Sequence, residues 1–186
     1  MLTFLSTNKH KVHLAQNNLF PLGVTFHQDI FPFIEIQSDN PTDITIDKAR
    51  QAFKDLQKPI FVTDDSWYMT ALNGFPGPYM RHVNGKLKEG EFLRLMQPYE
   101  NREIILHRVL CYIDKNGSKT FEDKIFGEIL KEATDYGDVP LLNIISFLPS
   151  HKSVAQAWNE GTQELPHETI WRDFATWYKK YNLSQE

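Results

Sequence analysis

Two adjacent carboxylates, Asp64 and Asp65, are the residues of this 186-residue chain best suited to chemistry. The apolar run before them, residues 60–62, predicts a buried strand that delivers both acids to its C-terminal end. Open α/β sheets bind ligands at that edge. Successive strand side chains point to opposite faces, so one carboxylate can hold a metal ion while the other reaches a water molecule. An Asp-Asp-Ser turn without a catalytic role is the alternative, because these residue types favour turns.

A loop rich in glycine and proline follows the acids at residues 73–79. It contains Gly74, Pro76, Gly77 and Pro78 within five residues. These residue types restrict the backbone to special conformations, so the loop is expected to follow a fixed and unusual path. A simple connector would not need such a path.

A candidate phosphate-binding turn lies near the N-terminus. Residues 2–5 predict a short buried strand, and the polar residues 6–8 precede a predicted helix at 9–19. A helix N-terminus carries unpaired N–H groups and partial positive charge, which suit a phosphate, and Lys11 adds a full charge. A plain helix cap with surface lysines is the alternative.

The remaining patterns predict an α/β fold in a single domain, residues 1–186. Further strands are expected at 24–36 (broken by Pro32), 104–114, 119–130 and 141–148, and further helices at 43–57, at 87–96 and after Pro166. An Asn-Gly pair at 116–117 predicts a hairpin. In the last helix an apolar, mainly aromatic stripe is expected to form core rather than a cofactor site: Ile170, Phe174, Trp177, Tyr178 and Tyr181.

Composition narrows the class of protein. The formal net charge of -4 and a pI of about 6.0 argue against nucleic acid or an anionic membrane as the main partner. A single cysteine, Cys111, excludes an intramolecular disulfide and a Cys-rich metal site. No apolar run approaches the ~20 residues of a membrane span, and the N-terminus lacks a basic region followed by a long apolar one. We therefore expect a soluble, cytoplasmic protein.

Several segments match the motifs of one family in content, order and spacing. Residues 6–11, Ser-Thr-Asn-Lys-His-Lys, are similar to a Thr-Gly-Asn-x-x-Lys phosphate turn. Residues 43–49 are similar to a Glu-x-x-x-x-Lys-Ala helix start, with Asp in place of Glu. Residues 63–66 and 71–79 resemble the central signature, and residues 126–129 resemble a Gly-x-Ile strand. On these motifs the first 130 residues or so resemble the inosine triphosphate pyrophosphatase family, which clears non-standard purine nucleoside triphosphates.

The resemblance implies a fold and an activity. The fold is a mixed, elongated sheet flanked by helices, with two lobes, a central cleft and a homodimeric assembly. The activity is hydrolysis of a nucleoside triphosphate between its α and β phosphates, with Mg²⁺ as cofactor. This reaction needs charge neutralisation and an in-line water, which carboxylates and cations supply.

The resemblance also assigns roles to residues. Asp64 and Asp43 would be metal ligands, and Asp65 would orient or deprotonate the attacking water. The acid at 43 is shorter than the family's Glu, so its metal contact is expected to pass through a water molecule. The residues expected to hold phosphate oxygens are Thr7, Asn8, Lys11 and Lys54.

The C-terminal third departs from the family where the base is read. The expected aromatic-Gly-aromatic-Asp-Pro segment has no copy. If residues 147–149 and 152–156 match the segments that follow it, Asn143 stands at the position of the Asp. The alternative matches residues 136–140 and requires a later insertion.

Two further positions differ from the family. The expected Ser-His-Arg motif is best matched at His167, where the Arg is replaced by Glu168 and the charge is reversed. Next to the acids, Trp67 replaces a smaller residue and is expected to narrow the pocket or stack on a base. The candidate substrate-binding residues are therefore Ser66, Trp67, Asn143 and His167.

Intact acids beside an altered base-reading segment favour retained hydrolysis with a changed base preference, since one base contact is worth about 1 to 3 kcal/mol. Two alternatives remain. One is a non-catalytic nucleotide-binding or sensing protein on the same fold. The other is a pyrophosphatase for a different nucleotide class, such as modified or pyrimidine triphosphates.

Overall fold

The computed structural model describes residues 1–162 and 168–184, and the chain divides into two compact units. Unit 1 contains Met1–Asp64, Arg108–Asp123 and the described residues from Glu168 on. Unit 2 contains Asp65–His107 and the described residues from Lys124 to Thr162. Three strands have residues in both units: β3 (Ile60–Met69), β5 (Glu103–Asp114) and β6 (Gly117–Ile129). The single domain expected for the whole chain stays a prediction.

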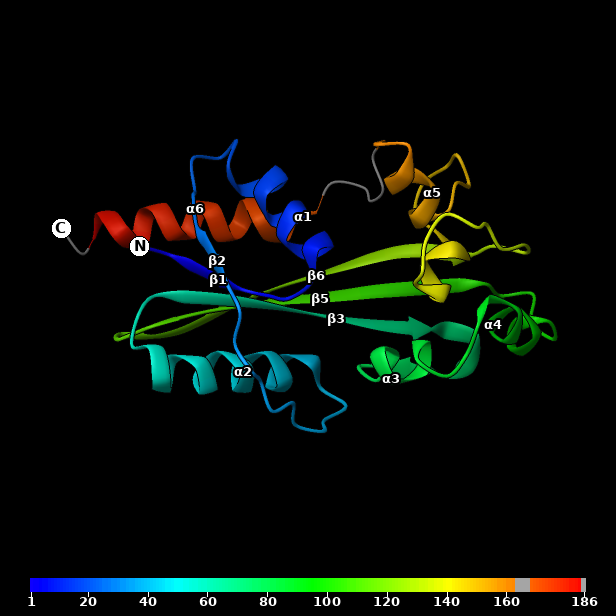
Figure 1. The fold of residues 1–186 in the computed structure, drawn as a ribbon, viewed down its shortest axis with the longest axis horizontal. Helices are drawn as coiled ribbons and strands as arrows, with labels where there is room; N and C mark the ends of the chain where they lie inside the picture. Colours follow the sequence, from blue (N-terminus) through cyan, green and yellow to red (C-terminus); the bar gives the residue numbers. More distant parts are fainter. Residues whose placement is uncertain (163–167, 185–186) are drawn as a thin grey trace. The chain divides into compact units, whose positions relative to one another are not determined.

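Unit 1 is a mixed sheet with helices on both faces. Its strand order is β2-β1-β3-β5-β6, in which β1 (Thr3–Leu5) is parallel to both β2 (His27–Asp29) and β3. Figure 1 shows α1 (Lys9–Leu19) and α6 (Thr169–Leu183) on one face and α2 (Pro41–Leu56) on the other. The mixed α/β sheet flanked by helices confirms the predicted fold class, and the central cleft stays a prediction.

Strand alternation divides the core of unit 1 into two layers. Phe4 and Phe61 stack with ring centroids 4.5 Å apart and face α1 and α6. The residues that alternate with them, together with Ala49 and Ala52 of α2, form the second layer: Leu5, Ile60, Val62, Cys111 and Ile113. The apolar stripe of the last helix lies in or against the first layer, as predicted.

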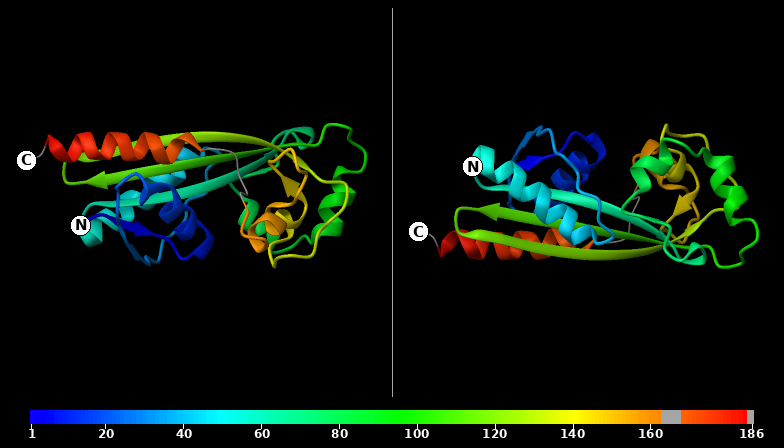
Figure 2. Two further views of the ribbon diagram at one scale, coloured as in Figure 1. Left: turned by 90° about the horizontal axis from the view of Figure 1, so that it is seen from above. Right: turned by 90° about the horizontal axis from the view of Figure 1, so that it is seen from below.

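The predicted Asn-Gly hairpin joins β5 to β6 and lies beside α6 (Figure 2). The carboxylate of Asp114, just before the turn, accepts hydrogen bonds from Tyr112 Oη at 3.0 Å and from Tyr181 Oη at 2.8 Å. Burial, reinforced by the Asp114 charge, raises the pKa of Tyr112. At the other end of α6, Asp123 accepts from the Thr169 amide at 2.7 Å and so caps the helix. Side chains of the hairpin therefore fix both ends of α6.

Unit 2 is built on short elements around the ends of the long strands. They are η1 (Thr70–Leu72), β4 (Pro76–Gly77), α3 (Met80–Asn84), α4 (Glu89–Met96), η2 (Pro140–Asn143), β7 (Ile145–Ser146) and α5 (Val154–Asn159). β7 pairs antiparallel with β6 beside Gly127, where an added Cβ would lie 2.5 Å from both Phe147 Cδ1 and the Ser146 carbonyl oxygen. The predicted Gly-x-Ile strand thus contains a glycine because its neighbours leave no room for a side chain.

The loop at residues 73–79 has the unusual backbone path that its composition predicts. Asn73, Gly74 and Gly77 have φ values of 54°, 86° and 60°, in the left-handed region that favours glycine. Gly77 also pairs with Trp67 in the β3–β4 ladder. The loop therefore folds back on β3 directly after the acids.

Three predicted strands differ in the structure. Of residues 24–36 only His27–Asp29 form a strand, because after Pro32 the backbone bonds to a helix side chain instead of a neighbouring strand. Residues 141–148 give only the short β7, since a 3-10 turn uses the first of them. The strand expected to end at the two acids continues to Met69, because β4 supplies a partner for its second half.

The predicted helices are present, α1 with the predicted bounds and the others with shifted ends. α2 begins at Pro41 because Asn40 caps it, accepting from the Thr42 amide at 3.1 Å. α4 begins at Glu89 rather than at residue 87. None of the helices within the described ranges has the length and apolar character needed to cross a membrane.

Candidate active site

The two candidate acids lie in β3 just beyond the end of its parallel neighbour β1. β1 ends at Leu5, one residue after Phe4 pairs with Phe61 of β3. Asp64 and Asp65 therefore follow the carboxyl edge of the parallel strands, where α/β sheets bind ligands. Both are half-buried, and strand alternation points them to opposite faces of β3.

The ammonium group of Lys48 joins Asp64 to a second carboxylate, that of Glu35. Lys48 Nζ lies 2.6 Å from Asp64 Oδ1 and 2.5 Å from Glu35 Oε2. The side chains of Lys48 and Asp64 are only 11% and 13% exposed. Burial lowers the pKa of Lys48, but its attraction to Asp64 and its hydrogen bonds to both carboxylates outweigh burial and raise the pKa above its ordinary value. Lys48 is therefore a permanent cation between two acids.

Glu35 reaches this position because α2 holds its segment. The side chain of Gln51 accepts from the Ile34 amide at 3.0 Å and donates to the Ile34 carbonyl at 2.6 Å. Phe31 and Phe33, with ring centroids 5.0 Å apart, pack against the core layer beneath α2. One helix thus carries both the lysine and the side chain that positions the lysine's second carboxylate partner.

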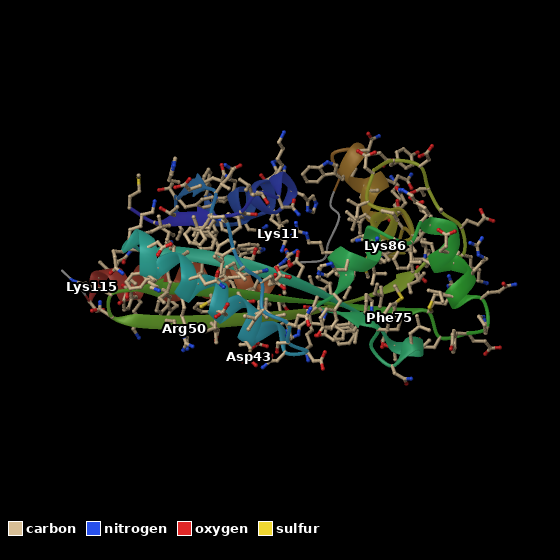
Figure 3. The ribbon with its side chains drawn as sticks, turned by 60° about the horizontal axis from the view of Figure 1, so that its bottom comes forward. Lys11, Asp43, Arg50, Phe75, Lys86 and Lys115 are labelled. Carbon is tan, nitrogen blue, oxygen red and sulfur yellow. The ribbon has the colours of Figure 1, made fainter. Side chains whose placement is uncertain are left out.

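The predicted phosphate turn forms a capped helix start. Asn8 Oδ1 accepts from the amides of His10 at 2.9 Å and Lys11 at 3.3 Å, and Thr7 is exposed. Lys11 Nζ lies 3.5 Å from the carbonyl oxygen of Thr63, the residue before the first acid. Figure 3 shows Lys11 on the side of α1. The turn therefore brings a lysine to the backbone just before the acids, while its phosphate role stays a prediction.

Among the described residues, Asp43 and Lys54 form no hydrogen bond or ion pair with either acid. Both are exposed, in the first and last turns of α2 (Figure 3 labels Asp43), and a helix separates them by about 16 Å along its axis. Lys48, midway between them, is the lysine of α2 that contacts Asp64. The metal role of Asp43 and the phosphate role of Lys54 stay predictions.

In unit 2, Ser66 and Trp67 follow the acids along β3. Ser66 is fully buried, and its Oγ has no hydrogen-bond partner within the described part of the chain. Trp67 is half-buried, and its ring lies 6.1 Å from that of Phe147 at an angle of 43°. Trp67 therefore offers aromatic surface two residues after the second acid and packs against the buried Phe147.

The side chain of Asn143 forms its hydrogen bonds within unit 2. Its Nδ2 donates to Glu89 Oε1 at 2.9 Å and to the Gly137 carbonyl at 2.7 Å, and its Oδ1 accepts from the Tyr136 amide at 3.2 Å. Both amide hydrogens are therefore occupied within the protein, and the residue is only 1% exposed. The geometry supports a scaffold role, while base recognition by Asn143 stays a prediction. His167 lies outside the described residues.

The reversed charge at position 168 is matched inside unit 1. The Glu168 carboxylate pairs with Arg108 and accepts from Trp171 Nε1 at 3.0 Å. Both charged side chains are at most 3% exposed. Glu168 is therefore neutralised by an internal cation.

The donor set around Lys48 fits a magnesium ion. Mg²⁺ is usually bound through one or two carboxylates, with waters and substrate phosphates completing its shell. Oxygens of Glu35 and Asp64 already converge on one cation, the Lys48 ammonium. Among residues 1–162 and 168–184, groups of three or more His, Cys, Asp or Glu side chains placed for a metal are absent, so a full protein cage is not formed.

Two residues of this arrangement were missed in the sequence. Lys48 belongs to the matched Lys-Ala motif, but that motif does not say which acid the lysine contacts. Glu35 lies in a segment with three isoleucines, Ile30, Ile34 and Ile36, and this apolar pattern gives no signal of a site. All three isoleucines are exposed in the structure. Only the Lys-Ala match was available as a signal.

The chain is similar over nearly its whole length to a known protein family and to several of its members. A sequence model of the Ham1 family matches residues 2–160. A protein of Methanopyrus kandleri named dITP/XTP pyrophosphatase is 30% identical over 183 residues, covering 95% of each chain. One of the same name from Thermococcus kodakarensis is 28% identical, covering 96% of this chain and 97% of that one. The structure of the Staphylococcus aureus Ham1 protein has a TM-score of 0.75 at 19% identity, covering 97% of this chain and 100% of that one, which establishes a common fold. The predicted resemblance is confirmed, and the chain belongs to the Ham1 family.

Proposed function

We propose that this protein hydrolyses a nucleoside triphosphate to a nucleoside monophosphate and pyrophosphate, with Mg²⁺ as cofactor. The observation that carries the proposal is the convergence of Glu35 and Asp64 on one cation, at the strand edge reached by Lys11. Relatives named dITP/XTP pyrophosphatase support the same reaction. Glu35 and Asp64 would hold the metal ion, which supplies charge neutralisation for the phosphates.

The chain's own residues position the triphosphate. The amides at the start of α1 and the ammonium groups of Lys11 and Lys48 provide positive potential where phosphate oxygens would lie. Lysines act there as point charges, so they neutralise the developing charge without dictating one fixed geometry. Phosphoryl transfer depends mainly on such positioning and electrostatics.

Asp65 accepts the proton of the attacking water. The water oxygen forms a bond to the α phosphorus while the bond from that phosphorus to the α–β bridging oxygen breaks. The bond electrons leave with pyrophosphate, and the water proton moves to the Asp65 carboxylate. Strand alternation allows this division, because Asp65 points away from the face on which Asp64 meets Lys48.

Base preference is proposed to differ from that of the family's usual inosine or xanthosine triphosphates. The residue at the expected Asp position, Asn143, spends both amide hydrogens inside the protein. Trp67, which packs against the buried Phe147, offers stacking surface in its place. Stacking accepts many bases, so a non-standard or modified nucleotide is the expected substrate.

A panel of nucleoside triphosphates tests the proposal. Purified protein with Mg²⁺ is assayed for pyrophosphate release from dITP, XTP, the standard nucleotides and modified purine and pyrimidine nucleotides. We expect faster release from at least one other non-standard or modified nucleotide than from dITP or XTP. Preference for dITP or XTP by orders of magnitude would refute the changed specificity while leaving the reaction intact.

Asp65→Asn separates catalysis from binding. Loss of a general base costs about 10²- to 10⁴-fold in rate, whereas nucleotide-induced thermal stabilisation should persist. If the unaltered protein is stabilised by nucleotides but releases no pyrophosphate from any of them, it is a nucleotide-binding protein without turnover.

A homodimer is also proposed, with the loop at residues 73–79 near the contact. Phe75 and Tyr79 in this loop are 45% and 36% exposed. Light scattering after size-exclusion chromatography measures the mass directly. A species of 21.8 kDa at micromolar concentration would contradict the dimer.

A further inference from the structure

Lys48 occupies the position at which the proposed metal ion would be held. Its ammonium is within 2.6 Å of oxygens from both Glu35 and Asp64. A divalent ion with the same two ligands needs the space around these oxygens and carries the same sign of charge. The lysine and the ion therefore compete for one pair of carboxylates.

The arrangement is constructed rather than incidental. Lys48 is almost fully buried on α2, and burying an ammonium is unfavourable unless charged partners compensate. The two hydrogen bonds between the Gln51 side chain and the Ile34 backbone fix the chain next to Glu35. The helix thus holds both carboxylate positions and provides the cation that keeps them together.

We propose that Lys48 is a positioning residue that acts as a built-in cation. It holds Glu35 and Asp64 together while no divalent ion is bound, and it must release both carboxylates when one binds. This inference rests on the proposed metal-dependent function. The released ammonium remains on α2 at the strand edge, where it can pair with a phosphate oxygen of an arriving nucleotide.

Competition between Lys48 and the metal ion predicts a change in metal affinity whose direction a purely structural lysine would not predict. Removing the ammonium leaves two carboxylates without their cation, so a metal ion binds without displacing anything. Nucleotide-free protein lacking the lysine charge should therefore bind a divalent ion more tightly than the unaltered protein. A lysine that only supports the fold, or that belongs to the metal site itself, predicts equal or weaker binding.

The decisive measurement is binding of MnCl₂ alone, followed by the electron paramagnetic resonance signal of free Mn²⁺. Lys48→Met should lower the Kd about tenfold, the size of one charge-assisted hydrogen bond. Lys48→Arg keeps the cation, so its Kd should equal or exceed that of the unaltered protein. Arg50→Met is the matched control because it removes an exposed positive charge from the same helix (Figure 3).

A second variant should move affinity in the opposite direction. Gln51→Ala frees the backbone beside Glu35 without changing any charge, so Mn²⁺ binding should weaken about threefold. If Lys48→Met folds only with metal, a Mn²⁺-dependent gain of helical circular dichroism supports the proposal. Absence of that gain overturns it. So does a folded Lys48→Met that binds Mn²⁺ no more tightly than the unaltered protein or Arg50→Met.

The outcome is separable from that of the proposed function. Tighter Mn²⁺ binding by Lys48→Met, without pyrophosphate release by the unaltered protein, would refute the enzyme and leave the role of Lys48 intact. Pyrophosphate release that requires Mg²⁺, with unchanged Mn²⁺ affinity in Lys48→Met, would refute the role of Lys48 and leave the enzyme intact.

Discussion

The acid-bearing face of unit 1 and the segment of unit 2 expected to read the base use polar side chains in opposite ways. Around Lys48, charged groups contact one another at the end of the parallel strands, and Glu35 stays 34% exposed. Around Asn143, the side-chain hydrogen bonds go to its own unit, and the residue is 1% exposed. The proposed reaction and the proposed base preference therefore depend on two different sets of side chains.

The largest expected effect is on stability, at the reversed charge of position 168. Glu168→Gln removes the carboxylate that pairs with the buried Arg108, which should cost about 3–5 kcal/mol in the free energy of unfolding. Urea denaturation measures this loss. Glu160→Gln is the control, because Glu160 pairs with Lys152 at the surface and should cost no more than about 1 kcal/mol. A stable Glu168→Gln with altered base preference would instead place Glu168 at the ligand.

Next comes Asp64→Asn, which removes a charge from the acid-bearing face. Loss of one preorganised electrostatic partner should lower kcat by about 10²- to 10³-fold. Pyrophosphate release under saturating Mg²⁺ and nucleotide measures the effect. Asp55→Asn is the control, an exposed acid of α2 whose loss should leave the rate unchanged. Equal rates in both variants would remove Asp64 from the site.

The base-reading segment is tested by two substitutions of Asn143. Asn143→Ala leaves its buried partners unsatisfied and should cost about 2 kcal/mol. Asn143→Asp restores the residue type that the family carries but sets a carboxylate against Glu89 and the Gly137 carbonyl, so it should cost more. Urea denaturation curves of the two variants show which one loses more stability. An Asn143→Asp variant that is stable and shifts preference toward dITP would show that this side chain reads the base.

The smallest effect is the pH dependence contributed by Cys111, beneath α2. Burial raises the pKa of this thiol to about 12, against 9.0 for the ordinary group, and the charge of Arg50 opposes this only in part. A raised folded pKa stabilises the protein fully below pH 9 and loses that contribution as pH rises toward 12. At pH 10 the loss is about 1.4 kcal/mol. Between pH 8 and 10, Cys111→Ala should lose less stability than the unaltered protein. Identical losses in the two proteins would contradict the burial of the thiol.

Much of the local structure could be predicted. Capping residues marked the start of α1, the Asn-Gly pair marked the hairpin, and the family signature selected Asp64 and Asp65. Signals of this kind depend on neighbouring residues, so they survive without knowledge of the fold. The predicted strand at 24–36 is largely wrong after Pro32, where the side chain of Gln51, from another element, forms both backbone hydrogen bonds of Ile34.

The sequence by itself determined that a pair of acids would follow a buried strand and that Lys11 would lie at the start of a capped helix. Only the tertiary structure decided which cation and which second carboxylate meet Asp64. Asp43 and Lys54 satisfy the motif by type, yet helix geometry and the packing of α2 on the sheet turn Lys48 inward and hold Glu35 beside it. Propensity and alternation act over a few residues, whereas the convergence of charges from three segments depends on how a helix packs against a strand.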